Sequence, residues 1–266
     1  MDRFLAITLG FTLFLVGCGP SPAPTRVPAV ETRTLNVFAA ASLTDAFTEI
    51  GKNFEAANPG VSVVFNFAGS QALRTQIAEG APADVFASAN HTEMDALVMS
   101  GMVLQDAPRE FLMNRLVVIM PAENPAQLET LEDLARPGIK IVLAADEVPA
   151  GRYARQALDL MNGQYGSSFK DKVLANVVSN EDNVKQVVAK VQLGEADAGI
   201  VYTSDAFAAP DLKTIMIPDE VNVIARYPIA AIAKSANARL ADEFIDFVLS
   251  ADGQAVLQKW GFAPAR

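Results

Sequence analysis

Short apolar runs alternate with helix-like patterns along most of the chain, and this alternation limits the possible folds more than any other feature. The runs that look like buried strands are 34–40, 61–67, 83–89, 115–121, 139–145, 175–179, 197–202 and 227–233. Apolar residues at helical spacing lie between several of them, with helices centred near Ala157, Val188 and Phe247. The pattern predicts an α/β protein with mostly parallel strands. In such folds, ligands bind where the carboxyl ends of strands meet the starts of helices.

Composition narrows the possible partners. The chain has 266 residues, 51% of them hydrophobic, which is enough for one large or two medium domains. Its net charge of -10 argues against nucleic acid or an anionic membrane surface as a partner. Cys18 is the only cysteine and His91 the only histidine. The chain therefore lacks the second cysteine or histidine that a disulfide, a catalytic triad or a histidine–cysteine metal cluster would need. We expect His91 on the surface, and Phe244, Phe247 and Trp260 in the core on one C-terminal helix.

The N-terminus is typical of an export signal. Arg3 precedes the apolar run 4–16, which is too short to span a bilayer. The run ends in LVGC, which resembles a bacterial lipobox whose cysteine, here Cys18, would carry a lipid; an ordinary secretory signal with an incidental cysteine is the alternative. Residues 1–18 are therefore predicted to be a signal peptide and 19–32, rich in proline and serine, a flexible tether. We expect an exported protein, lipid-anchored to the cell membrane or periplasmic.

Two predicted strand-to-helix junctions contain a serine. In AASLTDAF, Ser42 is a candidate N-cap, and Asp45 three residues later resembles the second half of a capping box. In FAGSQALRTQI, Ser70 takes the same role, and Gly69 lets the backbone turn tightly. Each serine could equally be nothing more than a helix cap.

Two further junctions offer backbone N–H groups. In EVPAGRYARQAL, Pro149 suits a first helical position, and Ala150 and Gly151 leave their N–H groups accessible. In SNEDNVKQVV, the helix is predicted to begin near Asp182, so that Val184 lies in its first turn. Unpaired N–H groups and the helix dipole make each helix start a potential anion site.

Four segments together resemble a known family. VFAAASLTDAF, FNFAGSQALRTQIAEGAPADVFASA, EVPAGRYARQAL and EDNVKQVVAKVQLGEADAGIVYTSDA are similar, in this order, to the extracytoplasmic molybdate-binding proteins of molybdate ABC transporters. The resemblance covers about 35–262 and implies the bilobal type II periplasmic binding protein fold. This fold has two α/β lobes, expected here with mainly parallel sheets, and a ligand cleft between them. We expect lobe I to contain 34–114 and 226–266, and lobe II 115–225.

The resemblance also implies a function and a site. Carried over residue by residue, it implies that the oxyanion is held by Ser42, Ser70, Ala150, Val184 and Tyr202. These residues would contact the molybdate oxygens and would not ligate the metal atom directly. Gly69 departs from some relatives, which have a hydroxyl residue there.

The implied protein is a monomer that captures molybdate or tungstate, delivers it to an ABC transporter permease, and needs no cofactor. It would catalyse no reaction. A binding protein for another oxyanion such as sulfate, and an enzyme on the same bilobal fold, are the alternatives. The enzyme would require a protonatable group in the cleft, where the sequence offers only hydroxyls and amides.

Overall fold

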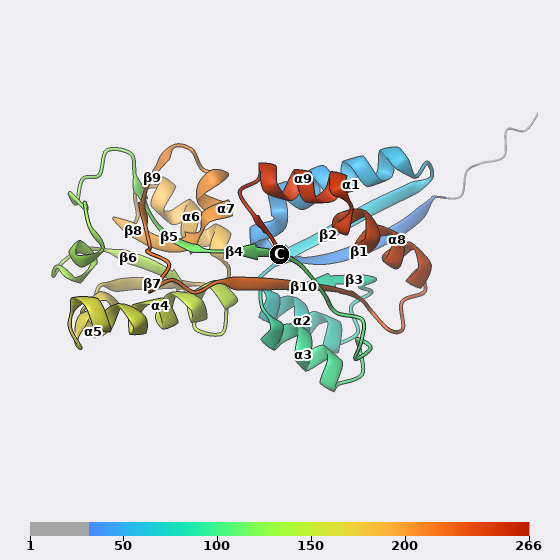
Figure 1. The fold of residues 1–266 in the computed structure, drawn as a ribbon, viewed down its shortest axis with the longest axis horizontal. Coiled ribbons are helices and arrows are strands. Elements are labelled where there is room, and N and C mark those ends of the chain that lie inside the picture. The colour runs from blue at the N-terminus through green and yellow to red at the C-terminus, as the bar shows by residue number, and fades with distance from the viewer. Residues whose placement is uncertain (1–31, 266) are drawn as a thin grey trace, which may run out of the picture. The chain divides into compact units, whose positions relative to one another are not determined.

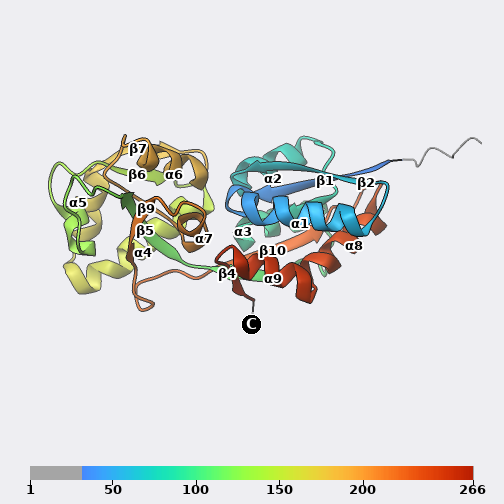
Figure 2. The same cartoon turned by 90° about the horizontal axis from the view of Figure 1, so that it is seen from above.

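The computed structural model describes residues 32–265, which form two β-sheets with helices on both faces of each (Figures 1 and 2). The predicted signal peptide 1–18, its Cys18 and the tether up to Glu31 lie outside the described residues. Within 32–265, no helix is both long and apolar enough to cross a membrane.

The first sheet has the strand order β11-β4-β10-β3-β1-β2. Its strands are β1 (Arg33–Ala40), β2 (Val61–Ala68), β3 (Val85–Ala87), β4 (Arg109–Asn114), β10 (Ala225–Ala231) and β11 (Ala263–Pro264). Two groups of helices pack on its opposite faces (Figure 1). One group is α1 (Thr44–Ala57), α8 (Ala238–Leu249) and α9 (Ala251–Lys259), and the other is α2 (Ser70–Ala78) and α3 (His91–Met99).

The second sheet has the order β7-β6-β8-β5-β9. Its strands are β5 (Leu116–Pro121), β6 (Ile141–Ala144), β7 (Val177–Glu181), β8 (Ala198–Tyr202) and β9 (Leu212–Met216). Figure 1 shows α4 (Pro149–Tyr165) and α5 (Phe169–Ala175) on one face, and α6 (Val184–Gln192) and α7 (Thr203–Phe207) on the other.

The chain passes between the two sheets twice. β4 ends at Asn114 and β5 begins at Leu116, so the first passage is at Arg115, and the chain returns before Ala225. The α/β prediction is confirmed, but the sheets are mixed rather than mainly parallel: four strand pairings are parallel and five antiparallel. The reason is that β4, β5 and β10 belong to the passages and not to β-α-β units, so they join their sheets antiparallel. β4 was not predicted because its apolar stretch, 111–113, is only three residues long and lies between charged and polar residues.

Burial on both faces explains why β1 reads as a continuous apolar run. Val37 belongs to the core that includes α1 and α8, whereas Phe38 packs with the residues of α2 and α3. On the α1 side, Phe244 makes edge-to-face contacts with Phe47 and Phe54, with ring centroids 6.1 and 5.3 Å apart. The helical spacing of these phenylalanines therefore corresponds to the buried face of each helix.

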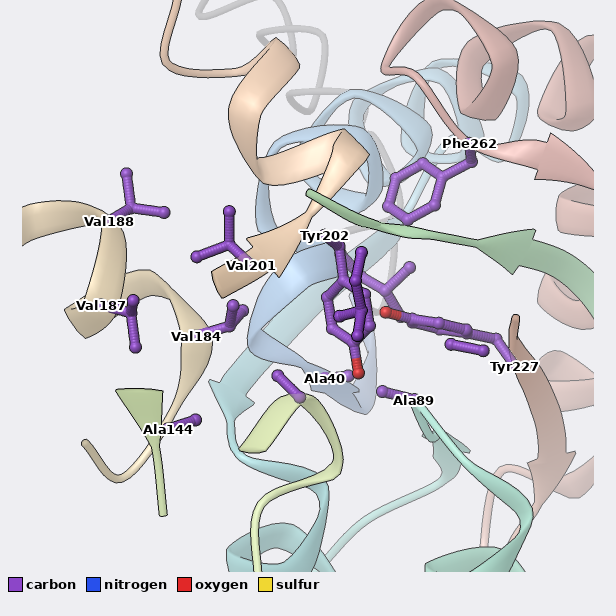
Figure 3. Packing of buried hydrophobic residues seen from close by; sticks show 14 of the residues in the cluster. Ala40, Ala89, Ala144, Val184, Val187, Val188, Val201, Tyr202, Tyr227 and Phe262 are labelled. Carbon is purple, nitrogen blue, oxygen red and sulfur yellow. The ribbon is translucent and has the colours of Figure 1, made fainter. Parts of the chain in front are cut away.

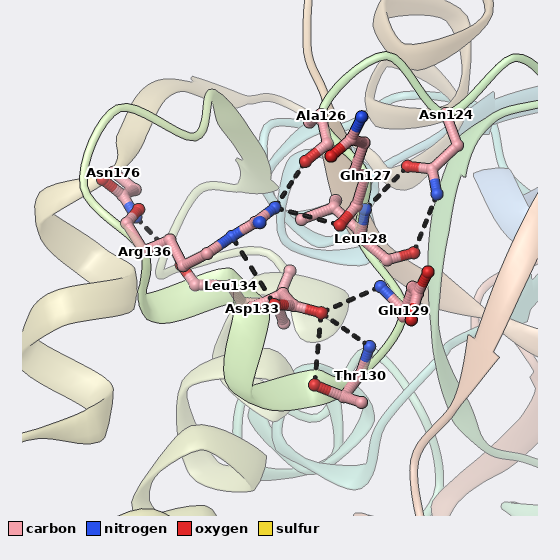
Figure 4. Close-up of polar contacts among 10 residues, drawn as sticks. All are labelled: Asn124, Ala126, Gln127, Leu128, Glu129, Thr130, Asp133, Leu134, Arg136 and Asn176. Carbon is pink, nitrogen blue, oxygen red and sulfur yellow. Dashed lines mark hydrogen bonds and ion pairs between the residues drawn. The ribbon is translucent and has the colours of Figure 1, made fainter.

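Polar contacts hold the connection between β5 and β6, which contains only the short 3-10 helix η2 (Leu131–Ala135) (Figure 4). Asp133 accepts hydrogen bonds from the backbone N–H groups of Glu129 at 2.9 Å and Thr130 at 2.8 Å, and these bonds lower the pKa of its carboxyl. Asn124 bonds both backbone groups of Leu128 at 2.9 Å. Side chains thus supply the bonds that a strand partner would otherwise make.

The predicted single C-terminal helix is two helices. Ser250 ends α8 and caps α9, because its hydroxyl accepts a hydrogen bond from the N–H of Gly253 at 3.2 Å. Trp260 comes just after α9 and is half-buried rather than in the core; its Nε1 donates to Glu49 at 2.8 Å.

Candidate functional site

Strand pairing places the predicted junctions side by side. β1 and β2 run parallel and end with Ala40 opposite Ala68, so the segments containing Ser42 and Ser70 start next to each other. β6 and β7 are also parallel and end together, which places the starts of α4 and α6 next to each other. The four junctions are far apart in the sequence, but in the structure they lie in two neighbouring pairs.

One small cavity connects all four junctions. It is narrow: the centre of a water-sized sphere can occupy only about 10 Å³ of it. Its walls are Ala40, Ala41, Ser42, Ala68, Gly69, Ser70, Ala89, Val148, Pro149, Ala150, Asn183, Val184 and Tyr202. The five residues implied by the resemblance are all among these lining residues, none of which carries a charge. A space of roughly 10–15 Å³ on this measure holds about one water molecule, so the cavity suits a group of a few atoms and not a drug-sized ligand.

Ser42 is not the N-cap that the sequence predicted. It lies in the 3-10 turn η1 (Ala41–Leu43), which ends β1, and Leu43 takes the cap position of α1. The tight turn places the serine two residues before the helix, so its hydroxyl is too early to cap it. Ser42 is buried instead, with its Oγ 2.9 Å from the hydroxyl of Tyr227.

Ser70 is also not an N-cap, because Gly69 occupies the cap position and Ser70 is the first residue of α2. The buried Ser70 Oγ accepts a hydrogen bond from the backbone N–H of Ala89 at 3.0 Å. Since this bond uses a lone pair, the hydroxyl proton of Ser70 is left to donate elsewhere. A Cβ on Gly69 would lie 2.6 Å from the carbonyl oxygen of Asp182, so only glycine fits this close approach.

The start of α4 agrees with the sequence prediction. Val148 is the N-cap and Pro149 the first helical residue. Ala150, 1% exposed, follows in the first turn, where its N–H has no acceptor within the helix. A Cβ on Gly151 would come within 2.7 Å of the carbonyl carbon of Ala144, so the absence of a side chain lets α4 begin directly against the end of β6.

The start of α6 lies two residues later than predicted. Asn183 is the N-cap, and its side-chain oxygen accepts from the N–H of Gln186 at 3.2 Å. Val184 is therefore the first residue of the helix, and its N–H also has no acceptor within the helix. The predicted start near Asp182 is too early because the side chain of Asn183 caps the helix.

Tyr202, the last residue of β8, brings a phenol to the cavity. The residue is 1% exposed, and its hydroxyl has no hydrogen-bond partner within residues 32–265. Burial raises its pKa well above the ordinary value, so the phenol stays protonated. Figure 3 shows this hydroxyl between Ala40 and Ala89, both of which line the cavity. A buried donor without a partner is rare in proteins and indicates a missing acceptor.

A cation lies close to the site, but its charge is already balanced. Lys185, the second residue of α6, donates to Asp45 on α1 at 2.6 Å and lies 3.5 Å from Asp205 on α7. Asp45 therefore does not form the predicted capping box. Asp205 is fully buried, and burial raises its pKa to about 6. The ion pair between Lys185 and Asp45 also joins a helix of the first sheet to one of the second.

The histidine does not line the cavity. His91 is exposed, as predicted, and its Nε2 lies 2.9 Å from Glu110. In the part of the chain that the structure describes, no three side chains of histidine, cysteine, aspartate or glutamate are grouped to hold a metal ion.

The sequence matches the family described as bacterial extracellular solute-binding protein over residues 35–263. The chain belongs to this family. Among its relatives is the molybdate-binding protein ModA of Mycobacterium tuberculosis, which is 40% identical over 253 residues, with 94% of this chain and 92% of the relative covered.

Solved structures confirm the bilobal fold of this solute-binding protein. The periplasmic molybdate-binding protein of Azotobacter vinelandii aligns with a TM-score of 0.76 at 20% identity, covering 87% of this chain and 100% of that one. The sulfate-binding protein SubI of Mycobacterium tuberculosis gives 0.79 at 20% identity and 87% of both chains. Both likenesses show the fold alone.

Sequence reasoning missed the two groups that hold the serines of this solute-binding protein, Tyr227 and the N–H of Ala89. Tyr227 was seen only as part of the strand run YPIAAIA. A tyrosine between buried apolar residues is one available signal, since a buried phenol usually finds a hydrogen-bond partner. Nothing local indicates that this partner is Ser42, 185 residues away.

Proposed function

We propose that this protein captures molybdate or tungstate outside the cytoplasm and passes it to the permease of an ABC transporter, without catalysing a reaction. The observation that carries the proposal is the buried phenol of Tyr202, a donor without a partner at a small cavity that is also lined by two serines and two helix starts. The name of the relative that is 40% identical supports molybdate as the ligand.

Donors of five residues would hold the anion: the hydroxyls of Ser42, Ser70 and Tyr202, and the N–H groups of Ala150 and Val184. Hydrogen bonds to an ionised oxygen are roughly twice as strong as neutral ones. The two helix starts add about half a positive charge each, which attracts the anion at close range although the net charge of the protein is -10. Because the attraction is local, no charged side chain is required in the cavity.

The kind of donor favours a fully deprotonated anion. Each serine oxygen already bonds a protein group, the Tyr227 phenol in one case and the Ala89 N–H in the other. The side chains therefore have protons to offer the ligand but no carboxylate to accept one. Molybdate, tungstate and sulfate have no proton to give near neutral pH, whereas phosphate keeps at least one throughout that range. A phosphate site would need an acceptor such as an aspartate.

We also propose that the protein closes around its ligand. Residues 34–114 with 226–266 would move as one lobe and 115–225 as the other, since the sheets change at Arg115 and again before Ala225. The anion would then be held from both sides and would favour the closed state. Lipid anchoring at Cys18 would keep the protein near its permease.

Calorimetric titration with molybdate, tungstate, sulfate and phosphate in one buffer tests the ligand. We expect molybdate and tungstate to bind tightly and the smaller sulfate and phosphate weakly. In Ser42→Ala or Ser70→Ala, the loss of one hydrogen bond to a charged group costs about 1.5–3 kcal/mol, so the dissociation constant should rise by roughly ten- to over a hundredfold.

Ser250→Ala is the matched control, because this serine caps α9 and lies outside the cavity. It should lose about 1 kcal/mol of folding stability and keep its molybdate affinity. If the unmodified protein bound sulfate more tightly than molybdate, sulfate and not molybdate would be the ligand. Unchanged molybdate affinity in both cavity-serine variants would show that these hydroxyls have only a structural role.

A further inference from the structure

Tyr227 lies on β10, the strand on which the chain re-enters the first sheet, and its hydroxyl is 2.9 Å from Ser42 Oγ. The residue is fully buried and is not part of the cavity wall. Its ring packs edge-to-face against Tyr202 and Phe262, with centroids 5.9 and 6.2 Å away (Figure 3), and against Phe111 at 6.4 Å. Three aromatic neighbours thus hold the ring, so its hydroxyl is a fixed point behind Ser42.

The direction of this hydrogen bond decides what Ser42 can offer a ligand. Within residues 32–265, the Tyr227 hydroxyl makes one hydrogen bond, the bond to Ser42. If Ser42 donated, Ser42 would have no proton for an anion, and the phenol proton would have to turn towards the nearby Tyr202 hydroxyl or Asn114 side chain. If Tyr227 donates, both protons are used, one on Ser42 Oγ and the other towards the cavity. The phenol is also the stronger acid of the two, and burial keeps it protonated by raising its pKa.

We infer that Tyr227 is a positioning residue for oxyanion capture: it donates to Ser42 Oγ and thereby directs the Ser42 proton into the cavity. The inference rests on the proposed function and adds to it a residue that the anion does not touch. The N–H of Ala89, which donates to Ser70 Oγ at 3.0 Å, does the same for the second serine. Hydrogen bonds in such a chain strengthen one another, so the anion, Ser42 and Tyr227 should act as a unit.

A double-mutant cycle of Tyr227→Phe and Ser42→Ala, read by molybdate calorimetry, tests this coupling. Tyr227→Phe keeps the ring and should weaken molybdate binding roughly tenfold. In the Ser42→Ala background, the same substitution should change the affinity by less than about twofold, because the Ser42 hydroxyl that connects Tyr227 to the anion is already missing. Tyr165→Phe, at the far end of α4, is the matched control and should leave the affinity unchanged.

Equal weakening by Tyr227→Phe in both backgrounds, or no weakening in either, would overturn the inference. No binding of molybdate, tungstate or sulfate by the unmodified protein would refute the proposed function and this inference with it. NMR of the Tyr227 hydroxyl proton in the unmodified protein needs no substitution and serves if the variant does not fold. The resonance should move downfield when molybdate is added, and a resonance that does not move would contradict the relay.

Discussion

Replacing Gly151 by alanine should damage the site through the backbone alone. The new Cβ would lie 2.7 Å from the carbonyl carbon of Ala144 and closer still to the carbonyl oxygens of Ala144 and Ala145. Ordinary contact begins at 3.4 Å, so the start of α4 must retreat by at least 0.7 Å, the difference between the two distances. Overpacking of this kind costs about 1–3 kcal/mol of folding free energy.

The same retreat moves the N–H of Ala150, the neighbouring residue. A hydrogen bond of about 2.9 Å that lengthens by this amount falls outside bonding geometry. We therefore expect Gly151→Ala to lose about 1.5–3 kcal/mol of binding free energy, or roughly ten- to over a hundredfold in the molybdate dissociation constant. Calorimetry measures the affinity, and urea unfolding measures the stability.

Gly163→Ala supplies the control, because it makes the same substitution in the same helix with nothing within 4 Å of the new methyl group. It should gain roughly 0.5–1 kcal/mol of stability, since alanine is the better helix former, and should keep its affinity. If Gly151→Ala matched this control in both stability and affinity, the close approach of α4 to β6 would not hold Ala150 in place, and the reasoning would be refuted.

Three further predictions concern side chains near the cavity. Tyr202→Phe removes a buried hydroxyl without a partner, so the ligand-free melting temperature should stay the same or rise while calorimetry shows roughly tenfold weaker molybdate binding. Asp205 has a pKa of about 6 in the folded protein, above its usual 3.8, so its protonated form favours folding; this contribution is complete below about pH 4 and is lost as the pH rises through 6. Urea unfolding of the unmodified protein, compared with Asp205→Asn, should show a relative loss of up to about 3 kcal/mol over that range, and parallel pH profiles would contradict this account. Asp45→Asn breaks a partly exposed ion pair with Lys185 that is worth about 0.2–1 kcal/mol, so stopped-flow should show molybdate leaving up to several times faster, with a smaller effect at high salt.

The positions of Ser42, Ser70, Ala150 and Val184 at helix starts could be predicted from the sequence because the signals are local, whereas Tyr202 was indicated only by the family resemblance. A proline at the start of α4 and glycines where backbones meet are visible in short windows. Parallel strand pairing then places these junctions at the same ends of the sheets. The helix-cap roles of Ser42 and Ser70 were wrong because cap position depends on the turn that precedes each helix, which the pattern does not specify.

The features that the sequence did not reveal depend on distant partners. β4 has only three consecutive apolar residues, 111–113, and becomes a strand because it pairs with β10 and β11. The bond between Tyr227 and Ser42 joins residues 185 positions apart. The pairing of Lys185 with Asp45 spans 140 positions and replaces the local capping box that was expected. In each case a contact between residues far apart in the sequence determines the structure, and the local sequence pattern does not show it.

Anomalous X-ray diffraction at the molybdenum edge, from crystals grown with molybdate, tests the central claim most directly. The account predicts one strong peak in the cavity, with anion oxygens within hydrogen-bonding distance of the hydroxyls of Ser42, Ser70 and Tyr202 and of the N–H groups of Ala150 and Val184. A crystal saturated with molybdate that showed an empty cavity, or a peak bound elsewhere on the protein, would contradict it.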